Sequence, residues 1–245
     1  MKKSFLTLLS ILAISHAAIN QSPGATPVVV CPPASIVECG VSTAFTANVL
    51  DADGDALVAV WTLNGFALQT NSVDAGGPPT TATISFTAGL PLGTNELAII
   101  VTDGTNTASC STTITVVDTT PPVISSVSTT PKGLWPPNHK LLPIIVKAVV
   151  TDTCGPATWK IVSVTSNESV NGHGDGNTPI DWVIIGDHKL KLRSERSGNG
   201  NGRIYTITIQ ATDESGNVSE PATVEVTVPH DQGKKLGHAP KQKRK

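Results

Sequence analysis

Residues 99–104 read Ile-Ile-Val-Thr-Asp-Gly, and residues 112–116 read Thr-Thr-Ile-Thr-Val. In the second run, Ile114 and Val116 alternate with threonines. Such alternation predicts a strand with one buried face and one solvated face. The Asp-Gly pair between the runs is a turn signal. Together the two runs predict a strand, a turn and a strand that end one β-sheet module.

A similar pattern recurs later in the chain, where residues 207–213 lead through Gly216 to residues 222–228. The repeat indicates two related modules and not one large sandwich. The chain offers further short strand-like runs, separated by turn signals every 8–12 residues or so, a spacing typical of immunoglobulin-like sandwiches. The runs are 35–38, 43–49, 57–63, 81–87, 95–102, 108–117, 123–129, 142–151, 158–167, 182–185, 190–195, 203–213 and 222–228. We therefore predict an all-β protein of two tandem immunoglobulin-like β-sandwich modules.

Proline and charge set the expected boundaries. Pro121-Pro122 lacks amide donors and favours an extended backbone, so it predicts a short, stiff linker between modules at 28–118 and 119–229. Residues 1–17 combine two lysines, an apolar run and small residues before Ala18, the pattern of a secretory signal peptide. Residues 230–245 are nearly devoid of apolar side chains and predict a disordered basic tail. We expect it to bind anionic surfaces or acidic modules, or to act only as a solubilising end.

Charge is unevenly distributed along the 245 residues. Residues 24–118 hold eight acids and no Lys or Arg, residues 119–229 hold nine bases and ten acids, and residues 230–245 carry a net +5. No run after the leader reaches the length of a membrane span, and no basic nucleic-acid-binding motif is present. The sequence therefore indicates a secreted protein that is extracellular, periplasmic or attached to a cell surface.

Several motifs identify a resemblance. Residues 31–39 (Cys-Pro-Pro-Ala-Ser-Ile-Val-Glu-Cys), 91–95, 108–111 and 118–124 (Asp-Thr-Thr-Pro-Pro-Val-Ile) resemble the hyalin-repeat (HYR) family of extracellular immunoglobulin-like modules. Residues 51–63 also resemble the related polycystic-kidney-disease type of module. The second module is similar to a C-terminal module of many secreted bacterial proteins. The matching runs are 134–140, 163–168, 174–177, 181–182 and 193–198.

The resemblance bears on the four cysteines, which by themselves allow three pairings. It implies a disulfide between Cys31 and Cys110. One cysteine of the first module, Cys39, is then left over, together with Cys154 of the second. Because a stiff linker favours an extended arrangement, we expect Cys154 to be a free thiol that could bridge to another molecule. The alternative is a Cys39–Cys154 bond, which we expect only if the modules fold back on each other.

Two segments could take ligands. The loop 171–177 and the following Asp181 supply oxygens of the kind that calcium prefers, and Asp175, Asn177 and Asp181 are the candidate ligands; the alternative is a flexible polar loop. Asp51-Ala52-Asp53-Gly54-Asp55 imitates the start of an EF-hand loop but lacks its twelfth-position carboxylate, which favours a plain turn over a weak calcium site. Trp135, His139 and Trp182 are candidate ligand contacts. A structural role for Trp135, covering the linker, is the alternative.

No nucleophile motif or metal-ligand spacing supports catalysis, and we expect Glu168 and Glu195 to form nothing more than exposed charges on strands. Apart from the calcium hypothesis, no cofactor is indicated. The resemblance implies a non-catalytic role in cell adhesion or as a surface or matrix spacer, with an extracellular protein or glycan as the partner. A carbohydrate-binding accessory protein is the alternative function, and an enzyme a remote one.

Overall fold

A computed structural model describes residues 24–172 and 178–231. All its regular elements are β-strands, and no helix in the described part is long and apolar enough to cross a membrane. The strands are β1 (Val28–Val30), β2 (Ser35–Glu38), β3 (Thr43–Asp51), β4 (Leu57–Leu63), β5 (Phe66–Val73), β6 (Thr80–Ala88), β7 (Gly93–Thr102), β8 (Thr107–Val117), β9 (Val123–Thr130), β10 (Leu141–Thr151), β11 (Ala157–Ser166), β12 (Trp182–Gly186), β13 (Lys189–Arg193), β14 (Gly202–Asp213) and β15 (Ala222–Pro229).

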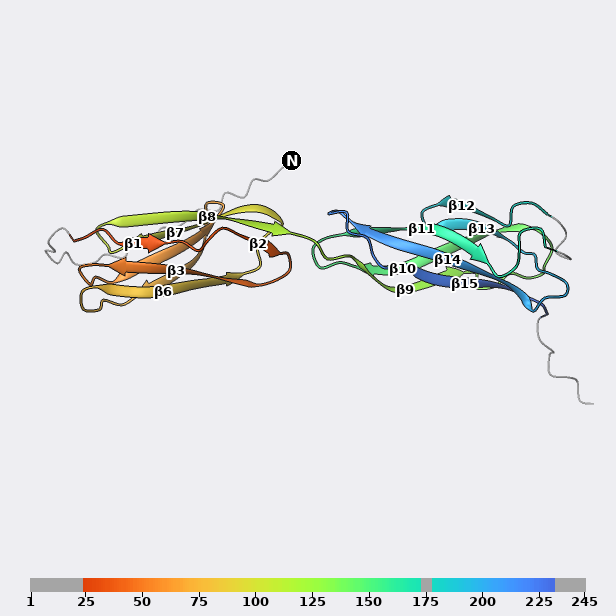
Figure 1. Ribbon diagram of the computed structural model, residues 1–245, viewed down its shortest axis with the longest axis horizontal. Helices are drawn as coiled ribbons and strands as arrows, with labels where there is room; N and C mark the ends of the chain where they lie inside the picture. Colours follow the sequence, from red (N-terminus) through yellow and green to blue (C-terminus); the bar gives the residue numbers. More distant parts are fainter. Residues whose placement is uncertain (1–23, 173–177, 232–245) are drawn as a thin grey trace, which may run out of the picture. The chain divides into compact units, whose positions relative to one another are not determined.

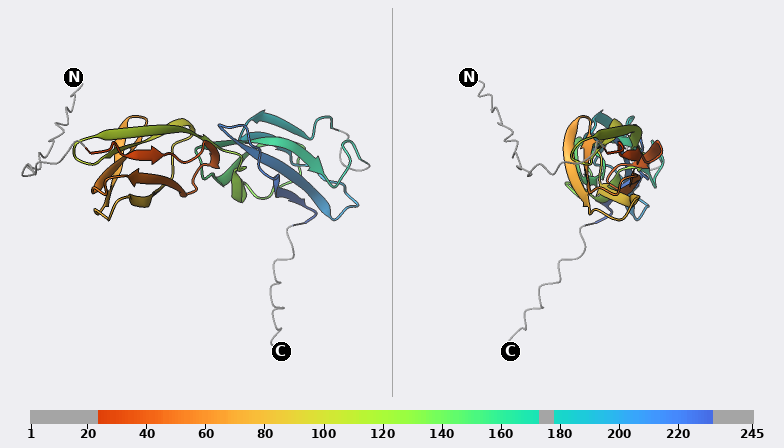
Figure 2. Two further views of the ribbon diagram at one scale, coloured as in Figure 1. Left: turned by 60° about the vertical axis from the view of Figure 1, so that its left-hand side comes forward. Right: turned by 90° about the vertical axis from the view of Figure 1, so that its left-hand side faces the viewer.

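The strands form four sheets, which Figure 1 labels. Two have the orders β1-β3-β6 and β2-β8-β7-β4-β5, and the other two have the orders β12-β13-β10-β9 and β11-β14-β15. Within each pair, two sheets face each other as layers, as the turned views in Figure 2 show. This arrangement confirms the predicted fold class of two tandem β-sandwiches.

Backbone contacts group residues 24–35, 43–88 and 94–114 into a first unit. The second unit contains residues 36–42 and 89–93 together with the described residues from 115 onward. Segments that precede the Pro121-Pro122 run in sequence therefore belong, by their contacts, to the second unit.

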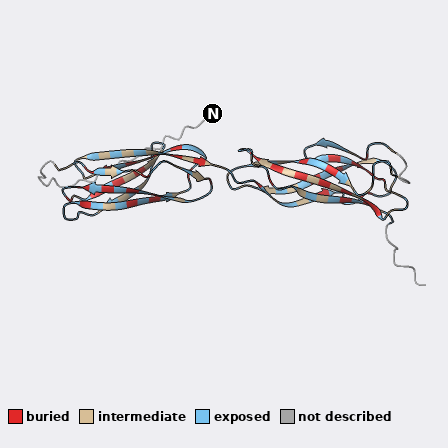
Figure 3. Cartoon of the chain, in the orientation of Figure 1, coloured by how far each residue is buried: buried red, intermediate tan, exposed pale blue. Residues whose placement is uncertain are grey.

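Each unit has its own core, made by the inward positions of alternating strands (Figure 3). In the first unit Trp61, on β4, is fully buried, and its ring lies 5.8 Å from that of Phe86. In the second unit the inward residues of β14, Tyr205, Ile207 and Ile209, have no exposed surface. The period-two pattern of the sequence thus defines both cores.

Most predicted strands form within one or two residues of the expected bounds. Two strands were not predicted. β1 has only three residues, β5 follows the Asn64-Gly65 turn, and neither strand has a fully buried residue. Both are edge strands. An edge strand buries little of its surface, so its sequence need not alternate.

The cysteines correct one expectation. Cys31 pairs with Cys110, as the resemblance implies, but Cys39 pairs with Cys154, so no described cysteine is free. The prediction of a free Cys154 thiol for bridging to another molecule was therefore wrong. Cys39 was assigned to the first module, but its contacts belong to the second unit. In the structure the amide of Cys39 donates to the carbonyl of Val117 at the end of β8, and both residues belong to the same unit as Cys154.

Candidate functional site: a buried charged cluster

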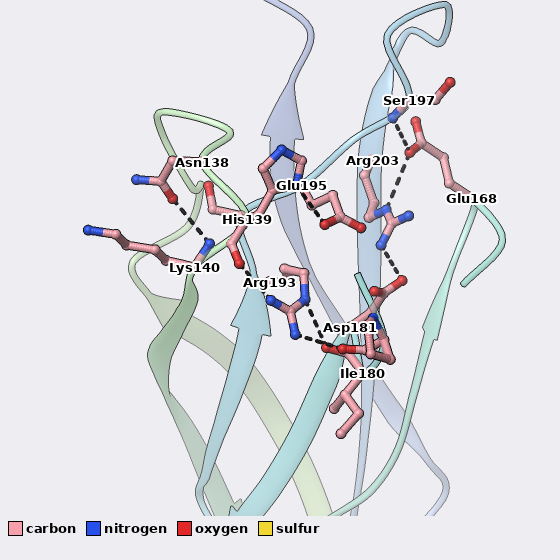
Figure 4. Close-up of polar contacts among 12 residues, drawn as sticks. Asn138, His139, Lys140, Glu168, Ile180, Asp181, Arg193, Glu195, Ser197 and Arg203 are labelled. Atoms are coloured by element: carbon pink, nitrogen blue, oxygen red, sulfur yellow. Dashed lines mark hydrogen bonds and ion pairs between the residues drawn. The ribbon is translucent and has the colours of Figure 1, made fainter. Parts of the chain in front are cut away.

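One end of the second unit encloses charged side chains that Figure 4 shows in close-up. We call Glu168, Asp181, Arg193, Glu195 and Arg203 the charged cluster. Glu168 follows β11, Asp181 precedes β12, Arg193 ends β13, and Arg203 is the second residue of β14. Burying so many charges is costly unless each is paired and hydrogen-bonded, so the partners of each side chain decide what the cluster does.

Arg203 lies at the centre of the cluster and has no exposed surface. Its Nη1 donates to the carboxylate of Asp181 and to the hydroxyl of Tyr205. Its Nε lies 3.3 Å from Glu168 Oε2, and its Nη2 donates to the carbonyl of Ser169. Burial by itself lowers the pKa of Arg203, but Tyr205 and Asp181 more than offset this effect, so the pKa is raised and the guanidinium stays charged.

Tyr205 contacts this ion pair through its hydroxyl group. Its hydroxyl donates to the carbonyl of Arg193 at 2.9 Å while accepting from Arg203. Burial raises the pKa of Tyr205 to about 12, with Asp181 and Glu195 adding to the increase and Arg203 opposing it. The phenol is therefore neutral at physiological pH.

Arg193 is bonded through its guanidinium to backbone carbonyls. Nε donates to Ile180, Nη1 to His139 and Nη2 to Pro179, at 2.6–2.9 Å. Ile180 and His139 both have a positive φ, at 69° and 62°, which is unfavourable for non-glycine residues and most of all for a β-branched one. Arg193 therefore holds two strained loop residues in place.

His139 and Glu195 form the outer edge of the cluster. His139 Nδ1 lies 2.8 Å from Glu195 Oε2; the histidine side chain is half exposed and the glutamate fully buried. Glu195 Oε1 has no hydrogen-bond partner among the residues that the structure describes. Ser194 Oγ also donates to the carbonyl of Pro136, and the His139 amide donates to the carbonyl of Ser194. The segment that carries Trp135 is thereby fastened to residues 193–195.

The predicted site residues have different environments. Trp135 is 43% exposed. Trp182 is partly buried, with its ring edge-on to Tyr205 at 6.3 Å. Asp181 is buried against Arg203, and its carbonyl accepts from the amide of Arg193, whose side chain also reaches His139. The structure thus brings His139, Asp181 and Trp182 to one cluster.

Asp175 and Asn177 lie outside the described residues, so calcium at this loop stays a prediction. The expectation that Glu168 and Glu195 are exposed was wrong. Their side chains are 14% and 0% exposed, and each pairs with a different partner, Glu168 with Arg203 and Glu195 with His139.

Arg203 and Arg193 were missed in the sequence. A signal for Arg203 was present, because it shares the inward phase of β14 with Tyr205, Ile207 and Ile209. A charged residue in the phase of core residues indicates a buried charge that requires a partner. The residues around Arg193 in the sequence do not indicate that its guanidinium donates to loop carbonyls, because those carbonyls lie up to 54 residues away.

A cavity of about 370 Å³ opens beside the cluster. Its described lining residues are Glu168, Ser169, Gly172, Ser197, Asn199, Gly200 and Arg203. Glu168 Oε1 is buried there without a hydrogen-bond partner among the described residues, and a Cβ at Gly200 would lie 2.9 Å from it. A side chain at position 200 would therefore displace this carboxylate.

Three other carboxylates of the second unit could hold a metal ion. Asp118, Asp152 and Asp213 each offer an oxygen within 4.8 Å of the other two. Asp213 accepts several hydrogen bonds; burial raises its pKa, but bonds from Asn217, Gly216 and Ser215 outweigh burial, so the pKa is lowered. Asp152 Oδ2 is buried and without a partner. The nearby Cys39 and Cys154 are disulfide-bonded and supply no thiolate.

The first unit has a surface of a different kind on the outer face of the β1-β3-β6 sheet. A groove of about 430 Å³ is lined by valine, leucine, alanine, threonine and asparagine side chains, with no charged residue. Val28 pairs across the strands with Leu50, and Val30 with Asn48. We call Val28, Val30, Asn48, Leu50 and Thr83 the neutral face.

Comparison with known proteins adds little. No family model matches the chain, and no curated protein matches it significantly. Fibronectin(III)-like modules of CbhA from Clostridium thermocellum align at 17% identity over 38% of this chain and 98% of their own, with a TM-score of 0.30. Titin domains Z1Z2, solved in complex with telethonin, align at 14% identity over 86% and 98%, with a TM-score of 0.38. Immunoglobulin domains 1–4 of Sidekick-1 align at 14% identity over 86% and 50%, with a TM-score of 0.36. At these identities and TM-scores the alignments do not indicate a function.

Proposed function

We propose that the protein is a secreted, non-catalytic immunoglobulin-like protein of the hyalin-repeat type. It acts in adhesion, or as a spacer on a surface or in a matrix, by binding an extracellular protein. The two disulfides support an oxidising compartment outside the cytoplasm. The charged cluster supports a structural role for its carboxylates, because Arg203 engages Asp181 and Glu168 and His139 engages Glu195.

The neutral face carries this proposal. An exposed sheet face with aliphatic side chains and no charge is unusual on a monomeric surface and is typical of the centre of a protein interface. Val28 and Val30 are exposed on an edge strand of three residues, so a partner could also reach the unpaired backbone of β1.

Attachment of protein-coated beads to cells of the producing organism tests the proposal. We expect attachment to disappear after protease treatment of the cells and with Val28→Glu/Val30→Glu. The matched control, Val123→Glu/Phe66→Glu, changes two exposed residues outside the face and should attach normally. Attachment that survives both protease treatment and the face variant would rule the proposal out.

A carbohydrate-binding role is the second candidate, and the exposed indole of Trp135 favours it. An aromatic side chain on a segment fixed by Ser194 and Arg193 can stack on an apolar sugar face at little entropic cost. A glycan array distinguishes the two roles: binding that Trp135→Ala abolishes would support this candidate.

A further inference from the structure

We propose that the outer face of the β12-β13-β10-β9 sheet is a docking surface for the acidic loops of the first unit of a second copy of this chain. We call Ile145, Lys147, Val183, Ile185, Lys189 and Lys191 the basic face. The association is head to tail, because it joins two different surfaces. It is independent of the neutral face and of the adhesion role proposed above.

Strand register places five of these side chains on one side of the sheet, and the sixth, Ile185, lies exposed at the register shift of β12. Lys191 pairs with Pro143 on β10 and with Val183 on β12, and Lys189 pairs with Ile145. The alternate residues of β13, Leu190 and Leu192, are fully buried. Because neighbouring residues of a strand point to opposite faces, the two lysines lie on the solvent side together with the cross-strand partners Val183 and Ile145.

The basic face combines positive charge with exposed aliphatic surface. Lys147, Lys189 and Lys191 are all exposed, and Ile145, Val183 and Ile185 are 44%, 37% and 52% exposed. Strands β9, β10, β12 and β13 contain no Asp or Glu. Among the described residues, none of the three lysines has a carboxylate within ion-pair distance. The nearest acid along the chain is Asp187, in the turn between β12 and β13.

The occupant is identified by charge complementarity within the same chain. Residues 24–118 contain eight acids and no Lys or Arg. Four of these acids lie in three loops: Asp53 and Asp55 between β3 and β4, Asp74 between β5 and β6, and Asp103 between β7 and β8. No cationic side chain of those residues can neutralise them.

The three loops meet at one end of the first unit. A Cβ at Gly54 would lie 3.0 Å from the carbonyl of Gly76, so the first two loops touch. The side-chain Nδ2 of Asn106, in the third loop, donates to the carbonyl of Gly24 at 3.1 Å. The amide of Ala25 in turn donates to Asp53. The acids therefore form one compact negative end, with Asp53 and Asp74 exposed.

A contact between this end and the basic face neutralises both surfaces and covers aliphatic side chains. Opposite potentials raise the rate of encounter and fix the orientation of the partners. Since the two surfaces differ, the contact is heterologous, and each copy keeps one free docking surface. The association should therefore continue into open chains as concentration rises and weaken as salt screens the charges.

Sedimentation velocity of the full-length secreted protein tests the proposal. In low salt we expect the average mass to rise with protein concentration, and to fall to the monomer mass on the order of 0.5 M NaCl, where screening is strong. Lys147→Glu/Lys189→Glu/Lys191→Glu should weaken association at least about tenfold. The matched control, Lys132→Glu/Lys140→Glu/Lys160→Glu, has the same charge change on exposed lysines elsewhere. It should associate more strongly than the basic-face variant.

A charge-swap pair separates specific docking from a general charge effect. Asp53→Lys/Asp74→Lys should also fail to self-associate, whereas an equimolar mixture with the basic-face triple variant should form a complex. A wild-type protein that is monomeric at all concentrations in low salt would overturn the proposal. A triple variant that associates like the wild type would also overturn it, and so would a mixture of the two variants that forms no complex. The same holds if the three lysines bind dextran sulfate or anionic vesicles but not a second copy of the chain. Circular dichroism of each variant verifies folding.

Discussion

Arg203 Nη1 donates to the carboxylate of Asp181, and neither side chain has any exposed surface. Asp181 precedes β12 in one sheet and Arg203 belongs to β14 in the facing sheet. The ion pair therefore joins the two layers of the second unit at its charged end. Pairs of this kind add little stability over an apolar pair, but breaking one is costly because the remaining charge stays buried.

Arg203→Met should destabilise the protein by about 3–5 kcal/mol, since it leaves Asp181 and Glu168 buried without their cation. Urea unfolding monitored by tryptophan fluorescence measures the loss. Lys160→Met, at an exposed position of β11, serves as the control and should change stability by less than about 0.5 kcal/mol. A loss below about 1 kcal/mol for Arg203→Met would contradict the central role of this guanidinium.

The stability of the protein should decrease in alkali through Tyr205. Its folded pKa of about 12 exceeds the ordinary value of 10.0, so the folded state retains the phenol proton more strongly than the unfolded state. The resulting stabilisation is complete below pH 10 and is lost as pH rises to about 12. Two pKa units correspond to about 3 kcal/mol.

Tyr205 is the only tyrosine in the chain, so tyrosinate absorbance reports on it alone. Tyr205→Phe should have a lower baseline stability but should lack this part of the alkaline loss, whereas lysine titration affects both proteins equally. An absorbance midpoint near pH 10 in the folded protein would show that the phenol is not protected.

Thiol labelling of the unfolded, non-reduced protein should give no label, because Cys31 pairs with Cys110 and Cys39 with Cys154. The bonds span 79 and 115 residues, and chain entropy assigns each about 4–5 kcal/mol of stabilisation. Cys39→Ser/Cys154→Ser should therefore lower the melting temperature markedly while leaving the Cys31–Cys110 peptide intact in a non-reducing map. Two labels per chain in the wild type would refute the second bond.

Asp152→Asn should stabilise the protein in the presence of a chelator by about 0.5–1.5 kcal/mol. Asp152 Oδ1 accepts from the Cys154 amide, a bond that asparagine keeps, while Oδ2 is buried near Asp118 and Asp213 without a partner. The asparagine amide would replace like-charge repulsion with a donor. Asp187→Asn, at an exposed turn, is the control for net charge. A destabilised Asp152→Asn in chelator would show that the carboxylate is compensated in another way.

The fold was predictable because its signals are local. A strand with one buried face shows its alternation over a few residues, as Ile114 and Val116 do, and glycine or proline marks each turn. The edge strands β1 and β5 were missed for the same reason, because a strand that buries little has little pattern to show.

The sequence alone determined the class of fold and the acidic character of residues 24–118. Only the tertiary structure decided the partners of Cys39, Arg203 and Glu195, which lie 115, 22 and 56 residues away in the chain. Strand formation depends on neighbours in sequence, whereas a disulfide or a buried ion pair depends on which loops the packed sheets bring together. These pairings depend on the register of the strands and on the burial of each charge, and no short segment of the chain determines either.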